Sequence, residues 1–192
     1  MPTSAPRANA STPPTRPTRR EMRILVIGCS GAGKSTLARA IADRYGLPVV
    51  HLDRHYWRPG WVAPDEAEWL ADVVRLIQEP AWVMDGNYSR KMPQRLAIAD
   101  AVVHLDLPRW LCLLRVLRRI ALGYGRSRPD VAPGCPERLD WAFFKWVWNY
   151  PRRTRPKTCA LLRAFPRPVI GLESAAAVRS WRERGMPLEG SG

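Results

Sequence analysis

The sequence lacks most of the features that mark membrane, secreted and zinc-binding proteins. It has no uninterrupted apolar run of about 18 residues, which excludes an ordinary transmembrane helix. Its N-terminal residues have no apolar core of the kind found in a secretory signal, so we expect a cytoplasmic protein. The four cysteines, Cys29, Cys112, Cys135 and Cys159, do not have the spacing of zinc ligands, and we expect free thiols in a reducing compartment.

Acidic residues are scarce in two segments of the chain, whose net charge is +14. Residues 1–20 contain four arginines and no acid. Residues 109–167 contain 14 lysines and arginines but three acids, a net charge of +11. A segment of this kind indicates an anionic partner, and the candidates are nucleotide phosphates, nucleic acid and an acidic surface.

Strand and helix patterns alternate along the middle of the chain. We expect buried strands at residues 22–27, 48–52, 81–85, 101–106 and 167–172, and helices at residues 33–46, 64–78, 90–99, 109–122, 137–150 and 174–185. Repeated strand–helix units predict an α/β fold with a five-stranded parallel sheet flanked by helices. This domain spans residues 22–185, and we expect disordered tails at residues 1–21 and 186–192.

A glycine-rich stretch, GCSGAGKST, lies between the first predicted strand and the first predicted helix. It fits the P-loop pattern G-x-x-x-x-G-K-[ST] at every fixed position. Glycines let backbone N–H groups converge on an anion, the lysine reaches the β- and γ-phosphates, and the serine hydroxyl is a ligand for Mg²⁺. We therefore predict a P-loop NTPase fold that binds ATP and Mg²⁺ through Gly28, Ser30, Gly31, Ala32, Gly33, Lys34, Ser35 and Thr36.

Three aspartates lie at or near the ends of predicted strands, and strand ends face the ligand crevice in open α/β sheets. Asp85, which precedes a glycine, is favoured as the second partner of the metal. Asp106 is expected to cap the next helix. For Asp53 three roles stay open: a metal ligand, a residue that orients the acceptor hydroxyl, and a turn carboxylate paired with a nearby arginine. His51 and His55 straddle a strand end and are not expected to hold a metal.

The basic segment combines arginines with aromatic residues. Arg115, Arg118 and Arg119 lie on one face of a predicted helix. Arginines carried by a closing segment stabilise the charge that develops on a transferred phosphoryl group, although a solvated face is the alternative for any one of them. The predicted helix at residues 137–150 has a stripe of four large side chains, for which we expect core packing, with a base-stacking platform as the alternative: Trp141, Phe144, Lys145 and Trp148.

The motif set resembles a known family, the bacterial topology modulation proteins, which are adenylate-kinase-like P-loop proteins. The resemblance rests on GCSGAGKSTLAR, HLDRHYWRPGW, DGNYS, LDLPRWLCLLRVLRR, GCPERLDWAFFKWVWNYPRRTRPK and VIGLES, and covers residues 22–185. It implies a nucleoside monophosphate kinase-like fold with a helical lid at about residues 124–157 and an acceptor-binding segment at residues 54–79. The tryptophan-rich sequence HYWRPGW departs from a monophosphate pocket, which leaves the acceptor open.

The resemblance also implies roles for individual residues. Asp85 would hold Mg²⁺ together with Ser35, Arg115 and Arg119 would clamp the phosphates, and Arg90 would lie near the acceptor. With Lys34 these give the predicted catalytic set Lys34, Asp85, Arg115 and Arg119, the acceptor residues Asp53 and Arg90, and the lid arginines Arg126, Arg128, Arg152 and Arg153.

The predicted function is transfer of the ATP γ-phosphate to a small acceptor, a nucleoside or a nucleotide. A nucleotide-dependent DNA-binding regulator is the first alternative, because the basic segment 109–167 suits nucleic acid. A small-metabolite kinase with Asp53 as its base is the second. No membrane partner is expected.

Overall fold

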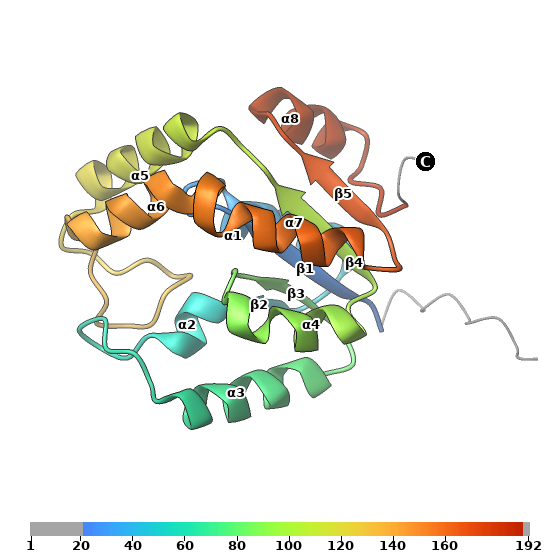
Figure 1. Cartoon of the computed structure of the whole chain (residues 1–192), viewed down its shortest axis with the longest axis horizontal. Helices are drawn as coiled ribbons and strands as arrows, with labels where there is room; N and C mark the ends of the chain where they lie inside the picture. Colours follow the sequence, from blue (N-terminus) through green and yellow to red (C-terminus); the bar gives the residue numbers. More distant parts are fainter. Residues whose placement is uncertain (1–20, 190–192) are drawn as a thin grey trace, which may run out of the picture.

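The computed structural model describes residues 21–189 and centres on one parallel β-sheet (Figure 1). Its strands are β1 (Arg23–Gly28), β2 (Val49–His51), β3 (Trp82–Asp85), β4 (Ala101–Leu105) and β5 (Val169–Leu172). Their order is β2-β3-β1-β4-β5, and every pairing is parallel. The predicted α/β class and five-stranded parallel sheet are therefore confirmed. The first strand lies at the centre, so the loop that follows it is flanked by the ends of β3 and β4.

Helices cover both faces of the sheet (Figure 1). They are α1 (Lys34–Tyr45), α2 (Leu52–Tyr56), α3 (Glu66–Gln78), α4 (Met92–Ile98), α5 (Arg109–Gly123), α6 (Trp141–Arg153), α7 (Arg155–Arg163) and α8 (Ala175–Glu183), with a short 3-10 helix η1 (Ser89–Lys91) before α4. The α2 and α7 helices were not predicted. The other helices begin and end within a few residues of the predicted bounds.

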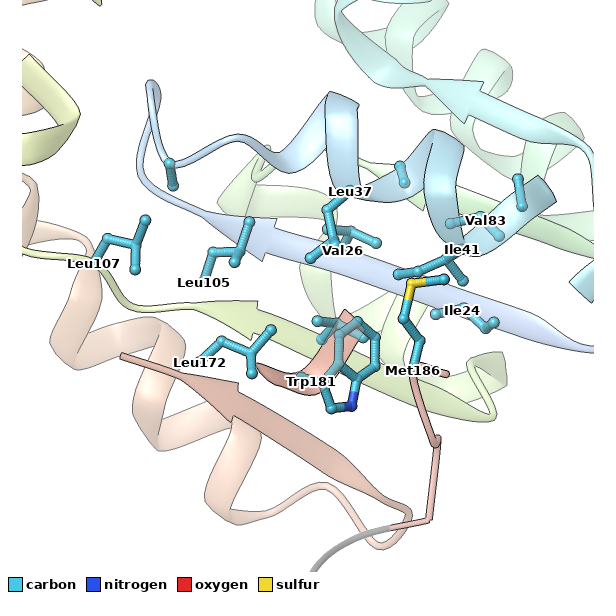
Figure 2. Packing of buried hydrophobic residues seen from close by; sticks show 14 of the residues in the cluster. Ile24, Val26, Leu37, Ile41, Val83, Leu105, Leu107, Leu172, Trp181 and Met186 are labelled. Atoms are coloured by element: carbon cyan, nitrogen blue, oxygen red, sulfur yellow. The ribbon is translucent and has the colours of Figure 1, made fainter. Parts of the chain in front are cut away.

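Successive side chains of β1 point to opposite faces of the sheet, so they belong to two separate hydrophobic cores. Ile24 and Val26 point to one face, where they pack with Leu37 and Ile41 of α1 and with Trp181 of α8 (Figure 2). Each of these side chains is almost fully buried. The α1 helix is thereby fixed against the sheet, and its first turn is held next to the end of β1.

The opposite face of β1 supports the second core. Leu25 and Ile27 pack there with Val73 of α3, Met92 of α4 and Leu162 of α7. The α3 helix, which belongs to the predicted acceptor segment, and the α4 helix therefore pack against the same strand that leads into the P-loop.

The aromatic helix differs from the prediction in its bounds. The α6 helix begins after Asp140, whose carboxylate accepts a hydrogen bond from the Phe143 N–H at 3.1 Å. It does not stop at Pro151 but continues to Arg153, and the Thr154 N–H still bonds to the Tyr150 carbonyl at 3.0 Å. A proline removes one donor and disfavours a helix interior, but it does not forbid continuation where packing holds the next turn.

The expected burial of the aromatic stripe is wrong. Trp141 is 88% exposed and Trp148 is 48% exposed, whereas Val147 and Tyr150 form the buried side of α6. Both sides of this helix carry aromatic residues, so periodicity alone did not identify the buried one. Lys145 is exposed with the two tryptophans.

The C-terminal boundary also differs from the prediction. Met186 is 8% exposed, and its carbonyl accepts a hydrogen bond from the Tyr45 hydroxyl at 2.8 Å. The Trp181 indole donates to the Pro187 carbonyl at 3.0 Å. The packed body therefore extends beyond residue 185. The predicted N-terminal tail up to residue 20, and residues 190–192, lie outside the described residues. Across residues 21–189, no helix is both long enough and apolar enough to cross a bilayer.

Candidate functional site

The P-loop joins β1 to α1 and is shaped by close backbone contacts. Gly28 and Gly31 have φ angles of 147° and 81°, in the region that favours glycine. A Cβ atom at Gly28 would lie 2.4 Å from the Leu105 carbonyl oxygen, and one at Gly31 would lie 2.3 Å from the Cys112 carbonyl oxygen. Both positions need glycine because β4 and α5 pack directly against the loop.

Side chains from two other elements hold the P-loop in place. The Gly28 N–H donates to Asn87 Oδ1 at 3.0 Å, and Asn87 Nδ2 donates to the Gly28 carbonyl at 2.7 Å. Arg115 Nη1 donates to the Ala32 carbonyl at 3.1 Å. Lys34 Nζ donates to the Cys29 carbonyl at 3.1 Å. The predicted residues Lys34 and Arg115 are therefore brought to the loop, and Asn87 is a supporting residue that the sequence analysis missed.

A buried arginine shapes the turn that carries Asn87. Arg95 of α4 is fully buried, and its guanidinium donates to the carbonyl oxygens of Gly86, at 2.9 Å, of Tyr88, at 3.1 Å, and of Asn87. Burial lowers the pKa of Arg95 to about 10. The charge is satisfied by backbone dipoles, so this arginine is bound within the protein and is not available to a phosphate. Nothing in the sequence of α4 distinguishes Arg95 from a surface arginine, so this role was not predicted.

Asp85 ends β3 beside the P-loop and is 4% exposed. Its Oδ1 atom lies 2.7 Å from Nδ1 of His51, which ends β2 and pairs with Asp85 in the register of the sheet. The structure therefore places Asp85 where the sequence predicted it. The contact with His51 was missed, because adjacency of β2 and β3 in the sheet is not visible in the sequence. A histidine that holds one carboxylate oxygen fixes the orientation of the other.

Asp53 lies in the first turn of α2, directly after β2. Its Oδ1 atom accepts a hydrogen bond from the Tyr88 hydroxyl at 2.6 Å. Burial raises the pKa of Asp53 above its usual value, although Tyr88 and the charge of Lys34 act in the opposite direction. The nearby arginine Arg58 pairs instead with Glu68 and, at 3.7 Å, with Asp72. The interpretation of Asp53 as a turn carboxylate paired with arginine is therefore wrong.

Asp106 does not cap the following helix. Its Oδ2 atom lies 2.6 Å from Nη2 of Arg155, and both carboxylate oxygens accept from Nε of Arg155 at 2.8 Å. The residue at the N-cap of α5 is Pro108. The predicted capping role is wrong, because the start of α7, which the sequence did not reveal, brings Arg155 to this aspartate.

Two predicted arginines meet at one buried carboxylate. Glu137 Oε1 lies 3.0 Å from Nε of Arg119 and 2.5 Å from Nε of Arg128, and the Glu137 side chain is 5% exposed. Neither contact has hydrogen-bond geometry, so the attraction is ionic. Burial lowers the pKa of Arg119. We name these three residues, together with Asp130, the arginine cluster.

Asp130 connects the arginine cluster to the P-loop. Its Oδ2 atom accepts from Arg128 Nη1 at 2.6 Å. Burial alone would raise the pKa of Asp130, but Arg128 and the hydroxyl of Ser35 hold it below its usual value. The other predicted lid arginines are exposed and, within the described residues, make no hydrogen bond or ion pair with the P-loop: Arg126, Arg152 and Arg153.

The predicted lid loop rests on the predicted acceptor segment. Trp61 Nε1 donates to the Pro136 carbonyl at 2.9 Å, and the Gly60 N–H donates to the Gly134 carbonyl at 2.7 Å. Trp61 also packs against a small apolar cluster that includes Val131. Figure 1 shows this loop running from α5 and α6 to the segment after α2. The tryptophans of HYWRPGW therefore hold the lid loop.

A cavity of about 430 Å³ lies between the start of α3 and the turn after β3. Arg90 is at its mouth: the side chain is 84% exposed, and Nη1 lies 3.2 Å from Oε2 of Glu66. The cavity is lined by Tyr56, Pro64, Asp65, Glu66, Trp69, Tyr88, Ser89, Arg90 and Lys91. Five of the nine lining residues belong to the predicted acceptor segment 54–79, and Arg90 is one of the predicted acceptor residues.

The oxygen atoms beside the P-loop fit a magnesium ion. Mg²⁺ prefers oxygen ligands and keeps several waters, so one or two protein groups and the nucleotide phosphates complete its shell. The Ser35 hydroxyl and the carboxylate of Asp85 are groups of this kind, and Asp130 interacts with Ser35. In residues 21–189 there is no group of three or more His, Cys, Asp or Glu side chains that could hold a metal ion by itself.

The four cysteines are free. Cys29 is 2% exposed, and contact with Cys112 together with burial raises the pKa of its thiol. A buried thiol of this kind is a poor nucleophile, which supports the interpretation of Cys29 as a small spacer residue of the loop.

Comparison with known proteins relates the chain to kinases. No family model matches the sequence. The adenylate kinase of Methanosarcina barkeri is 28% identical over 138 residues, or 55% of this chain and 63% of that enzyme. The adenylate kinase of Clavibacter michiganensis is 31% identical over 108 residues, which cover 55% of this chain and 52% of that enzyme. The chain thus spans between half and two thirds of the length of these two relatives.

Other similarities are longer or structural. The adenylate kinase of Agrobacterium fabrum is 26% identical over 165 residues, or 70% of this chain and 82% of that enzyme. Shikimate kinase from Acinetobacter baumannii, solved with shikimate, superposes with a TM-score of 0.54 at 19% identity over 85% of this chain and 90% of that one. A gluconokinase from Sinorhizobium meliloti gives 0.51 at 19% identity over 88% and 93%. The fold is therefore the P-loop kinase fold.

Proposed function

We propose that the protein is an ATP-dependent phosphotransferase that transfers the γ-phosphate to a small acceptor of the nucleoside or nucleotide type. One observation carries the proposal: Asp85 lies beside a fully formed P-loop, and the predicted lid loop rests on the segment that lines part of the cavity. The sequence similarity to adenylate kinases and the P-loop kinase fold support it.

The P-loop residues would bind the triphosphate. Backbone N–H groups of residues 29–31 and 33–35, which include the start of α1, would offer positive dipoles to the β-phosphate. Lys34 would exchange the Cys29 carbonyl for phosphate oxygens. Ser35 and Asp85 would hold Mg²⁺, which supplies charge neutralisation between the β- and γ-phosphates. His51 keeps Asp85 oriented toward that position.

Arg115, Arg119 and Arg128 would stabilise the charge that develops on the transferred group. Arg115 is already at the P-loop, whereas Arg119 and Arg128 are held next to each other by Glu137. Guanidinium groups fixed before the reaction need little reorganisation when charge develops, which is the basis of electrostatic catalysis. The docked lid loop would exclude water from the γ-phosphate.

A turnover assay tests the proposal. We expect acceptor-stimulated release of ADP from ATP in a screen of nucleosides, nucleoside monophosphates and sugars. Lys34→Ala should reduce turnover at least about a hundredfold, because the charge opposite the γ-phosphate is lost. Lys145→Ala, on the exposed side of α6, is the matched control and should turn over normally. Equal activity of both variants would contradict the assigned site.

A second candidate function has one specific observation in its favour. Trp141, Lys145, Trp148 and Arg152 follow one another on the exposed side of α6, and the guanidinium of Arg109 lies 4.1 Å from the centre of the Trp148 ring. Alternating aromatic and cationic groups suit stacked bases and phosphates of single-stranded nucleic acid. This supports the nucleotide-dependent DNA-binding regulator. Membership of the topology modulation family stays a prediction.

Fluorescence anisotropy with a labelled single-stranded oligonucleotide tests the second function. Binding that falls steeply with salt and weakens at least about tenfold in Trp148→Ala would support it. Absence of binding at low salt would remove it and leave the phosphotransferase. With either function we propose a cytoplasmic location, where the four free cysteines remain reduced.

A further inference from the structure

Tyr88 connects the proposed acceptor cavity to the P-loop. Its ring lines the cavity, and its hydroxyl donates to Asp53 Oδ1 at 2.6 Å. Asp53 lies two residues after His51, which pairs with Asp85 at the end of the neighbouring strand, so it is on the P-loop side of the sheet. An acceptor that extends from the cavity toward the γ-phosphate therefore meets the Asp53 carboxylate.

Two classes of acceptor need opposite surroundings at that point. The phosphate of a nucleoside monophosphate is dianionic near neutral pH, so it needs unpaired cations and is repelled by a neighbouring carboxylate. An alcohol is uncharged and keeps its proton, so it benefits from a carboxylate that orients the hydroxyl and accepts the proton. The position of Asp53 favours the alcohol.

The charges of the cavity point the same way. Lys91 Nζ lies 3.6 Å from Oε1 of Glu66, and Arg90 Nη1 lies 3.2 Å from Oε2 of the same side chain. Asp65 accepts a hydrogen bond from the Glu68 N–H as the N-cap of α3. The two acids and two cations that line the cavity cancel, which leaves no surplus positive charge for an acceptor phosphate.

The inner wall of the cavity is aromatic. The ring centres of Tyr56 and Tyr88 are 4.7 Å apart, and each is 5.0 Å from the ring centre of Trp69. These rings brace one another and present apolar surface to the cavity. A wall of this kind favours a ligand with a flat apolar body over a compact polyol.

We infer that the acceptor is an uncharged alcohol with a flat ring, such as a nucleoside, and not a nucleoside monophosphate; the inference rests on the proposed phosphotransferase function. The acceptor oxygen forms a bond to the γ-phosphorus of ATP as the bond between that phosphorus and the β,γ-bridging oxygen breaks. The hydroxyl proton passes to a carboxylate oxygen of Asp53, and ADP leaves with the bridging oxygen. The adenylate kinases that resemble part of this chain are named for a different acceptor.

The wild-type protein provides the first test. Adenosine, guanosine, cytidine, uridine and thymidine are each compared with their 5′-monophosphate, using ATP labelled in the γ-phosphate and chromatography of the products. We expect kcat/KM for at least one nucleoside to exceed that for its monophosphate by about tenfold or more. Preference for any monophosphate overturns the inference, and so does the failure of every nucleoside.

Variants provide the second test, with MgATP affinity measured in parallel by calorimetry. Asp53→Asn should reduce nucleoside phosphorylation by about a hundredfold or more and leave the Kd for MgATP within about twofold. Tyr88→Phe should reduce it less, because the carboxylate remains. Asp43→Asn, an exposed aspartate of α1, is the control and should be unchanged. Unaltered transfer by Asp53→Asn overturns the inference alone, whereas wild-type protein that does not bind MgATP overturns the proposed function.

Discussion

Substitution of Glu137 by Gln tests the arginine cluster most sharply. Glutamine keeps the shape of the side chain but removes the one carboxylate that Arg119 and Arg128 share. Asp130 still balances Arg128, so the change leaves one guanidinium without a counter-charge. Removing one partner of a buried ion pair destabilises a protein by about 3–5 kcal/mol.

The structure places the expected loss at the lower end of that range. The Arg119 and Arg128 side chains are 25% and 24% exposed, so water can partly compensate the unpaired charge. We expect a loss of about 3 kcal/mol in the free energy of unfolding. For a domain of this size, about 2–4 °C per kcal/mol gives a fall of about 6–12 °C in Tm.

Thermal unfolding and turnover are the measurements. If the cluster prepares both arginines for the γ-phosphate, kcat should fall at least about tenfold, more than KM for ATP rises. Asp140→Asn is the matched control, because it removes the same charge from the same segment, and asparagine caps a helix as well as aspartate does. A Tm for Glu137→Gln within about 1 °C of this control would show that the Glu137 carboxylate does not stabilise the two arginines.

Three further changes have expected outcomes. Trp61→Phe removes the hydrogen bond to Pro136, worth about 1 kcal/mol, so trypsin should cleave the lid loop about five times faster, and an unchanged rate would show that the loop is held elsewhere. Gly31→Ala adds a Cβ 2.3 Å from a carbonyl oxygen at a φ of 81°, which should weaken MgATP binding at least about tenfold, whereas Gly46→Ala, with nothing within 4 Å, should leave affinity intact. Asp53→Asn should raise Tm at pH 7, although it reduces phosphoryl transfer by about a hundredfold or more. Because the pKa of the Asp53 carboxyl is raised in the folded protein, folding takes up a proton. The free energy of unfolding of the wild type therefore falls as pH rises from 3.8 through the folded-state pKa. A lower Tm for Asp53→Asn than for the wild type at pH 7 would contradict this expectation.

The P-loop could be predicted from the sequence because its chemistry is local. Gly28, Gly31, Lys34 and Ser35 follow one another in a short segment, and an apolar strand and a helical pattern flank them. Gly28, at a fixed position of the motif, and Gly31, at a variable one, are explained by close contacts with β4 and α5, which are distant in sequence. The sheet could be predicted for the same reason, since each strand is a short, mostly apolar run between helices.

Residues whose role depends on pairing across the fold could not be predicted in this way. His51 meets Asp85 because β2 lies next to β3, and Glu137 meets Arg119 because the lid loop returns to α5. Neither neighbour is implied by spacing along the chain. Arg95 has no sequence signal at all, because its partners are backbone carbonyls.

The failures in the second half of the chain have a common physical cause. Aromatic residues occur on both sides of α6, so hydrophobic periodicity did not tell the buried side, with Val147 and Tyr150, from the exposed side, with Trp141 and Trp148. The predicted helix ended at residue 150, directly before Pro151, but in the structure α6 continues through this proline to Arg153. Local helix propensity predicts the end of a helix poorly where tertiary packing determines it.

The central claim is that residues 28–35 bind MgATP through backbone N–H groups and Lys34. Isothermal titration calorimetry of folded protein with MgATP tests it most directly, with Lys34→Ala measured under the same conditions. We expect saturable binding with one site per chain by the wild type and at least about a hundredfold weaker binding by Lys34→Ala. Absence of binding by the folded wild type, or equal affinity of the two proteins, would contradict it.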